Sequence, residues 1–157
     1  AASPLPLAWT PGAALSLRGP LGRGFALPAH ARRIALAAWD VSPAFLLGLI
    51  PAAHAQGAAI SLVCDDAPEG LPSEVEIRPL AALEEIAQWA DYLALAARRE
   101  GWRERVRNGD QIKVPREAQV LIVTPMPCGG LGKCGVCSVD VKRGMELACE
   151  DGPVFDW

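Results

Sequence analysis

Cysteine is the residue type whose placement in this chain most clearly indicates chemistry. Five cysteines are present, and four of them, Cys128, Cys134, Cys137 and Cys149, lie within 22 consecutive residues. A secreted fold stabilised by disulfides would spread its cysteines along the chain, so the clustering indicates a metal site in a reducing compartment, and we expect a cytoplasmic protein. Cys64, which ends an apolar run, is expected to be a small core residue.

The spacing of the four clustered cysteines, C-x5-C-x2-C-x11-C, favours an iron–sulfur cluster. Four thiolates that converge from a tight loop and one later residue can hold a [2Fe-2S] unit, with two cysteines on each iron. Glycines between them would let the backbone curl close to the cluster and point N–H groups at its sulfurs. These glycines are Gly129, Gly130, Gly132 and Gly135.

Structural zinc, also held by four thiolates, is the alternative for the same cysteines. Zinc sites usually combine two C-x2–4-C pairs on separate turns. This chain has one such pair, Cys134 and Cys137, and its first two cysteines are separated by five residues. Under this alternative the chain would be a non-redox adaptor domain, and its colourless zinc would distinguish it from a red-brown [2Fe-2S] protein.

The elements that must position the cysteines form a predicted α/β fold with a small parallel sheet. Apolar runs predict strands that are buried on both faces, and they alternate with predicted helices. One helix is expected over Ala44–Gln56, after Pro43 and before Gly57, and a longer one from about Leu80 to Arg107. The predicted strands are Ala13–Arg18, Arg33–Ala38, Ala59–Cys64, Glu74–Arg78 and Val120–Val123, the last of which leads directly into the cysteine segment.

Arginines crowd the far end of the predicted long helix. There they complement the helix dipole, so a solvated helix end is expected, with an anion-binding patch as the alternative. They are Arg98, Arg99, Arg103, Arg105 and Arg107.

Composition and charge argue against several other functions. The net charge of −3 does not suit a nucleic-acid-binding protein, which needs a surplus of basic groups. The longest apolar run, Ala44–Ala53, is interrupted by Pro51 and has about half of the roughly 20 residues that a membrane span needs. His30 and His54 are the only histidines, and each stands isolated, so no catalytic acid–base set is expected.

The whole chain resembles the electron-transfer subunit of the NAD-linked, two-subunit dihydroorotate dehydrogenases, in the ferredoxin-reductase superfamily. The resemblance rests on the cysteine loop with Cys149-Glu-Asp-Gly-Pro-Val-Phe, and on Gly19-Pro-Leu-Gly-Arg-Gly-Phe25. In that family a flavin-binding β-barrel precedes a nicotinamide-nucleotide domain and a C-terminal [2Fe-2S] segment. The resemblance therefore implies a flavin-barrel remnant at residues 1–28, a nucleotide-domain-like α/β unit at 29–124 and a cluster-binding segment at 125–157.

Departures from the family pattern bear on the cofactors. Only the end of the flavin barrel is recognisable, and five residues rather than four separate the first two ligands. The glycine-rich phosphate turn of the nucleotide domain is replaced by Ala37–Pro43, in which Trp39 would block close approach and Asp40 would repel phosphates. We expect the chain alone to bind neither FAD nor NAD(H); the alternative is an enzyme that still binds NAD(H).

The sequence and the resemblance together predict a non-catalytic electron-transfer component of an oxidoreductase. Its cluster would pass electrons between a flavin- or NAD(P)H-linked partner and a dihydroorotate-dehydrogenase-like catalytic subunit. The redox partner is expected to dock against residues 128–137 and 151–157, unless the apolar side chains there only cover the cluster; a homo-oligomer is also compatible with the sequence. These side chains are Met126, Leu131, Val136, Val154, Phe155 and Trp157.

Overall fold

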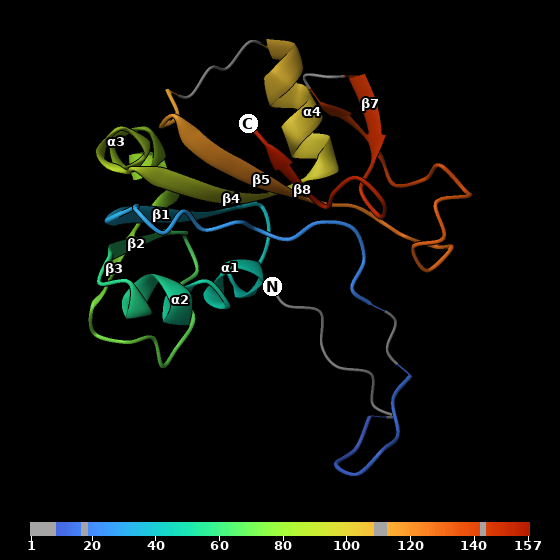
Figure 1. Cartoon of the computed structure of the whole chain (residues 1–157), viewed down its shortest axis with the longest axis horizontal. Coiled ribbons are helices and arrows are strands. Elements are labelled where there is room, and N and C mark those ends of the chain that lie inside the picture. The colour runs from blue at the N-terminus through green and yellow to red at the C-terminus, as the bar shows by residue number, and fades with distance from the viewer. Residues whose placement is uncertain (1–8, 17–18, 109–112, 142–143) are drawn as a thin grey trace.

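The computed structural model describes residues 9–16, 19–108, 113–141 and 144–157, and a six-stranded sheet is its main feature (Figure 1). The strands are β1 (Arg33–Trp39), β2 (Ala59–Val63), β3 (Val75–Arg78), β4 (Tyr92–Arg98), β5 (Glu117–Val123) and β8 (Val154–Asp156). Their order across the sheet is β3-β2-β1-β4-β5-β8; the first five are parallel, and β8 is antiparallel to β5. This confirms the predicted α/β fold with a parallel sheet.

Helices cover both faces of the sheet, which explains the continuous apolar runs of its central strands (Figure 1). On one face lie α1 (Ala44–Leu47) and α2 (Ile50–Ala55); on the other lie α3 (Leu83–Trp89), preceded by a 3-10 turn at Leu80–Ala82, and α4 (Arg99–Asn108). Successive residues of a strand point to opposite faces, so each central strand contributes to both cores.

The predicted long helix from Leu80 to Arg107 is wrong, because its middle forms β4 between β1 and β5. Small and medium apolar residues fill both sides of YLALAAR, so a helical spacing can be found within a strand that is buried on both faces. Asp91 marks the true start of the strand: its carboxylate accepts the N–H groups of Arg32 (3.1 Å) and Arg33 (3.0 Å). The helical spacing of the apolar residues therefore failed to predict β4, a central strand of the sheet.

The predicted helix over Ala44–Gln56 is also divided, into α1 and α2. Pro51 lies in the first turn of α2, where its missing N–H needs no partner, so it starts a second helix rather than continuing the first. Gly57 follows with a φ of +69° and ends the segment as expected.

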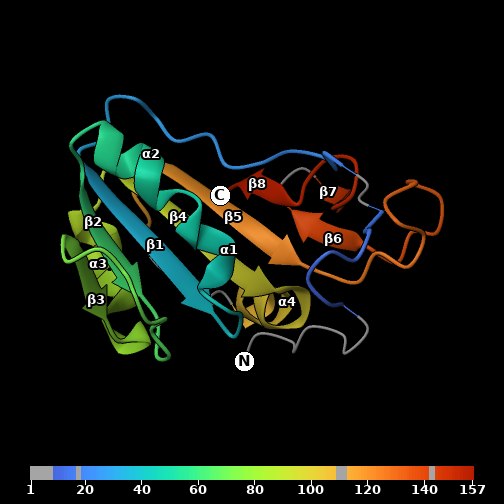
Figure 2. The same ribbon diagram turned by 90° about the horizontal axis from the view of Figure 1, so that it is seen from below.

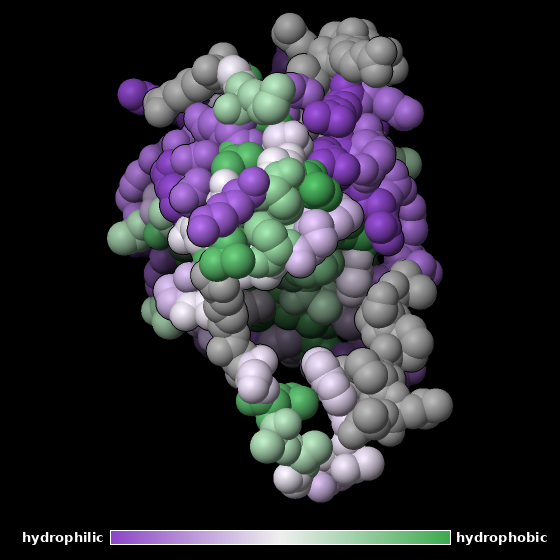
Figure 3. All heavy atoms as spheres, turned by 90° about the vertical axis from the view of Figure 1, so that its right-hand side faces the viewer, coloured by the Kyte–Doolittle hydropathy of each residue, from purple (hydrophilic) through white to green (hydrophobic). Residues whose placement is uncertain are grey.

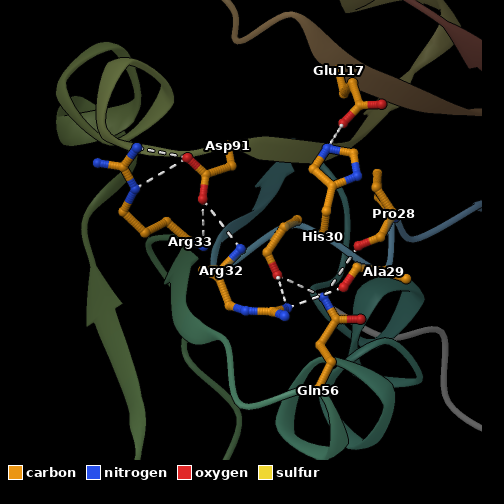
Figure 4. A network of polar contacts seen from close by, with 9 residues as sticks. Pro28, Ala29, His30, Arg32, Arg33, Gln56, Asp91 and Glu117 are labelled. Atoms are coloured by element: carbon orange, nitrogen blue, oxygen red, sulfur yellow. Dashed lines mark hydrogen bonds and ion pairs between the residues drawn. The ribbon is translucent and has the colours of Figure 1, made fainter.

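A polar network joins the segments at the amino ends of the strands (Figure 4). The guanidinium of Arg33 donates to Asp91, and together with the two backbone N–H groups it lowers the pKa of that carboxyl to about 2. His30 lies 2.9 Å from Glu117 and is exposed, and His54 is exposed on α2, so both histidines have the surface positions that were expected. This end of the sheet is opposite to the end that leads into the cysteines.

Residues 19–32, here called the strap, run along the sheet from the cysteine segment to the start of β1 (Figures 1 and 2). The Ala26 N–H donates to Gln119 of β5 at 2.8 Å, and Arg23 forms an isolated bridge with Pro153. The predicted strand at Ala13–Arg18 does not form over residues 13–16, and residues 17–18, like residues 1–8 of the predicted barrel remnant, lie outside the described part.

The C-terminal segment contains three strands that the sequence analysis did not predict. An antiparallel hairpin of β6 (Ser138–Val141) and β7 (Gly144–Leu147) is followed by β8, which completes the main sheet. Buried residues of this segment join the core on the α3 and α4 face. Among the described helices, none combines the length and apolar character needed to cross a membrane.

Candidate metal centre

The four clustered cysteines lie in the loops that flank the β6–β7 hairpin. Cys128 and Cys134 lie in the loop after β5, Cys137 immediately precedes β6, and Cys149 follows β7. Cys137 and Cys149 are 1% and 3% exposed, Cys128 is half-buried and Cys134 is exposed. The site therefore has a buried side and a side that faces solvent.

Cys137 and Cys149 form the buried pair. Their sulfurs are 3.4 Å apart, and the Ala148 N–H donates to the Cys137 carbonyl at 3.1 Å. That hydrogen bond fixes the start of β6 next to the end of β7, so the two cysteines are brought together by the hairpin although eleven residues separate them.

Cys128 and Cys134 form the second pair, which lies in the glycine-rich loop. The Leu131 N–H donates to the Cys128 sulfur at 3.4 Å, and the Cys134 side chain and the N–H groups of Lys133 and Cys134 also bond to it. The Leu131 N–H foremost, then the Cys134 side chain, lower the pKa of the Cys128 thiol to about 6. The lowered pKa favours the thiolate, the form that binds metals.

The loop also connects the two pairs. The Gly132 N–H bonds to Cys149, whose pKa is raised by its partner Cys137 first, then by burial, and also by the nearby charge of Cys128. Gly129, Gly130, Gly132 and Gly135 all have φ between +65° and +78°, so the loop needs residues without a Cβ, as the sequence indicated. At Gly132 a Cβ would also lie 2.7 Å from the Glu150 carboxylate.

Two connected pairs suit the donor set of a dinuclear cluster. Within the described residues, no three His, Cys, Asp or Glu side chains are grouped so that they could hold a metal ion, whereas the thiols stand as two pairs. Two cysteines per iron is the ligand pattern of [2Fe-2S], whereas zinc needs four donors around one point. The thiols present therefore fit the ligand set of an iron–sulfur cluster.

Helix α4 holds the β6–β7 hairpin against the sheet. Trp102 lies with its ring edge-on to Trp157 at 5.1 Å between centroids, and its indole N–H donates to the Asp140 carbonyl at 3.4 Å. Arg103 pairs with the Asp140 carboxylate at 3.1 Å, and Arg99 donates to the backbone on either side of Cys137.

The expectation of a solvated helix end is therefore wrong for these arginines, since the structure gives each described one a partner. Besides Arg99 and Arg103, Arg98 ends β4 and donates to the Asp40 carbonyl at 2.8 Å, and Arg105 lies over the Trp39 ring. The side chain of Arg107 lies outside the described part. Sequence spacing missed these roles because the arginines lie on two different elements.

The face around the cysteines is apolar in only part of the predicted docking area. Leu131 and Val136 are 48% and 42% exposed, and Figure 3, which looks at this side, shows apolar residues bordered by hydrophilic ones. Val154 and Phe155, in contrast, are buried because β8 belongs to the main sheet. Met145, which the sequence analysis did not single out, is 71% exposed on β7.

A separate cleft of about 450 Å³ lies at the carboxyl ends of β1, β2 and β4, where doubly wound sheets bind nucleotides. Its charged lining residues are Asp40, Asp65 and Asp66, together with the basic Arg98. The first N–H groups of α1 are already occupied: Ala44 donates to Ser42 Oγ at 3.3 Å, for example. Three carboxylates against one arginine leave the cleft with an excess of negative charge, which does not fit a dinucleotide pyrophosphate.

Trp39 and Cys64, which the sequence analysis discussed, lie differently with respect to this cleft. Trp39 does not line the cleft, because strand alternation places its ring on the opposite face of the sheet, in contact with Arg105. The prediction that Trp39 blocks the approach of a dinucleotide is therefore wrong, whereas Asp40 does line the cleft and places its negative charge there. Cys64 lines the cleft and is 4% exposed, and burial, followed by the charges of Asp65 and Asp66, raises its pKa. It is the buried core residue that was expected.

Comparison with known proteins supports an iron–sulfur site in the C-terminal segment. Residues 124–157 match the family model of the iron–sulfur cluster binding domain of dihydroorotate dehydrogenase B. The chain is also similar to the NADH-dependent reduced ferredoxin–NADP oxidoreductase, whose structure gave insights into flavin-based electron bifurcation. The identity is 20% and the TM-score 0.65, over 90% of this chain and 58% of the other.

These findings confirm the resemblance at the level of the fold and the C-terminal segment, and they support an electron-transfer role. This chain spans little more than half of the solved protein that it matches. Residues 124–157 therefore correspond to a segment that binds an iron–sulfur cluster in dihydroorotate dehydrogenase B, and the fold of the chain is similar to that of the ferredoxin–NADP oxidoreductase.

Proposed function

We propose that the chain binds one [2Fe-2S] cluster, with Cys128 and Cys134 on one iron and Cys137 and Cys149 on the other. The observation that carries this proposal is the arrangement of the thiols as two pairs, connected by the Gly132 N–H that bonds to Cys149. When bound, the cluster supplies one-electron transfer.

The protein contributes a fixed and partly dry environment. Cys137 and Cys149 lie in the same core as Trp102 and Phe155, which keeps water from that side. On the other side Cys134 is exposed, and Cys128 accepts the loop N–H groups that stabilise negative charge. The exposed pair therefore faces the surface at which a redox partner can approach.

The partner is a flavoprotein or a dihydroorotate-dehydrogenase-like subunit that docks over the exposed pair. Leu131, Val136 and Met145 supply large exposed apolar side chains on the cysteine loop and on β7, a composition that is typical of interfaces. The buried Val154 and Phe155 are excluded from this interface, which is smaller than the sequence predicted.

NAD(H) has no role in this proposal, because the acidic cleft does not fit its phosphates. We retain the division into residues 1–28, 29–124 and 125–157 as part of the proposal, with the α/β unit serving as the support for the cluster segment. Electrons from a flavin or NAD(P)H would then enter through the partner protein.

Metal and sulfide analysis of anaerobically purified protein tests the proposal. We expect about two irons and two sulfides per chain, retained in Cys64→Ser and lost in Cys137→Ser. The two variants form a matched pair, since both replace a buried cysteine. One zinc per chain, with no iron uptake after reconstitution with iron and sulfide, would instead establish the zinc-stabilised adaptor.

A further inference from the structure

Arg99 lies between the end of β4 and the buried cysteine pair. Its Nη1 donates to the Val136 carbonyl and lies 3.5 Å from the Ser138 carbonyl, so one guanidinium bridges the residues on both sides of Cys137. The side chain is only 17% exposed, and its other N–H groups contact the Glu100 carboxylate at 3.3 Å. The neighbouring Arg98 and Arg103 donate to Asp40 and Asp140 instead.

The backbone around Cys137 is held from three directions. Arg99 binds the carbonyls before and after it, the Ser138 N–H donates to Gly135 at 3.1 Å, and the Cys137 carbonyl accepts the Ala148 N–H at 3.1 Å. Because Ala148 directly precedes Cys149, the position of Cys137 determines where the second sulfur of the pair lies. The same nitrogen, Nη1, reaches both carbonyls, while Nε and Nη2 contact the Glu100 carboxylate, so the planar guanidinium is fixed on both sides.

Arg99 also places a positive charge against the peptide that contains the Cys137 N–H. The Val136 carbonyl and the Cys137 N–H belong to the same peptide group, so a cation on the carbonyl polarises that N–H. A polarised donor and a nearby cation both stabilise a cluster that has gained an electron. The ion pair with Glu100 reduces this effect, although Glu100 is 68% exposed and therefore well screened by water.

We propose that Arg99 is a positioning residue for the cluster, which holds the Cys137 ligand and raises the reduction potential. This inference rests on the proposed [2Fe-2S] function, and it extends that function from the cysteines to the helix that supports them. It concerns one reversible step, in which the oxidised cluster accepts one electron from a chemical reductant such as dithionite.

The test compares the wild type with Arg99→Gln, Arg99→Lys and the control Arg103→Gln. Arg103 belongs to the same helix and contacts the same hairpin, but its partner is the exposed carboxylate of Asp140 rather than the backbone next to a cysteine. The two readouts are the midpoint potential, from a redox titration followed by visible absorption, and the rate at which excess chelator removes iron.

In Arg99→Gln we expect the equilibrium constant for reduction to fall about threefold to tenfold, which is about 30 to 60 mV for a one-electron couple, and iron loss to become faster. Arg99→Lys keeps the charge, but its single nitrogen cannot bind the two carbonyls and the Glu100 carboxylate in the fixed geometry of the guanidinium. Its potential should therefore stay near the wild-type value while its iron loss is faster. Arg103→Gln should change neither.

Equal potentials in Arg99→Gln and Arg103→Gln would overturn the charge effect, and equal rates of iron loss in all four proteins would overturn the positioning role. If Arg99→Gln does not fold, as judged by circular dichroism, Arg99→Lys decides: iron loss as slow as in Arg103→Gln refutes the proposal. A wild-type protein without iron or sulfide would be a failure of the proposed function itself, and it is recognised before any variant is measured.

Discussion

Replacement of Gly22 by alanine should detach the strap from the cysteine segment. Gly22 has a φ of +58°, and a Cβ on it would lie 1.7 Å from the Gly152 carbonyl oxygen and 3.3 Å from that of Ala148. Both obstacles are backbone atoms, so no side-chain rotation can relieve the contact. The residues next to Gly22 are also the ones that connect the strap to the segment.

The cost of this substitution has an upper limit set by detachment. Release of the strap loses two backbone hydrogen bonds, from the Arg23 N–H to Gly152 and from the Val154 N–H to the Arg23 carbonyl, at about 1 kcal/mol each. The contact of Leu21 with the loop at Gly130 adds about 1 kcal/mol. We therefore expect the free energy of unfolding to fall by about 2 to 3 kcal/mol. Strain in the folded state cannot cost more than this, because the strap would then detach from the segment and relieve it.

Gly24→Ala is the matched control. It lies two residues further along the strap, a Cβ there meets no described atom within 4 Å, and its φ is not in the left-handed region. Its effect on the free energy of unfolding should stay within about 0.5 kcal/mol.

Two measurements on the iron-loaded chain distinguish these variants: denaturant unfolding and the rate at which chelator bleaches the visible absorption. Release of Leu21 from Gly130 uncovers the cysteine loop, so Gly22→Ala should lose iron faster than both wild type and Gly24→Ala. If the two glycine variants unfold at the same denaturant concentration and lose iron at the same rate, the strap does not protect the cluster.

Two further predictions concern the sheet that supports the site. Ser61→Ala should leave the free energy of unfolding unchanged or raise it by about 1 kcal/mol in denaturant titrations. The reason is that the fully buried Ser61 hydroxyl finds no hydrogen-bond partner among the described residues. A decrease of more than about 1 kcal/mol would contradict this and indicate a hydrogen bond to Ser61. The pKa of Asp91 is lowered from 3.8 to about 2 in the folded state, so its ionised carboxylate stabilises the protein fully above about pH 4, and this contribution is lost as the pH falls toward 2. The melting temperature of Asp91→Asn should therefore fall less than that of the wild type between pH 5 and pH 2. An equal fall in both proteins would contradict the ion pair with Arg33.

The central strands show where local sequence is sufficient and where it is not. Residues 33–38, 59–64 and 120–123 are short apolar runs between turn-forming residues. Each forms a strand or part of one, and only Cys64 lies beyond the end of its strand. β4 contains the same residue types, but no strong turn sequence separates it from α3 and α4. Its identity as the central strand depends on pairing with β1 and β5, which are distant in the chain, so a local pattern could not reveal it.

The cysteine spacing and the glycines between the cysteines were sufficient to predict an iron–sulfur segment, because ligand type and loop flexibility are local properties of the chain. The division of the thiols into a buried and an exposed pair, the contact of Arg99 with the backbone at Cys137, and the burial of Phe155 in β8 were decided only by the tertiary structure. Each of these features joins segments that are more than ten residues apart in sequence. Their energies come from packing and long-range pairing, which exist only after the chain has folded.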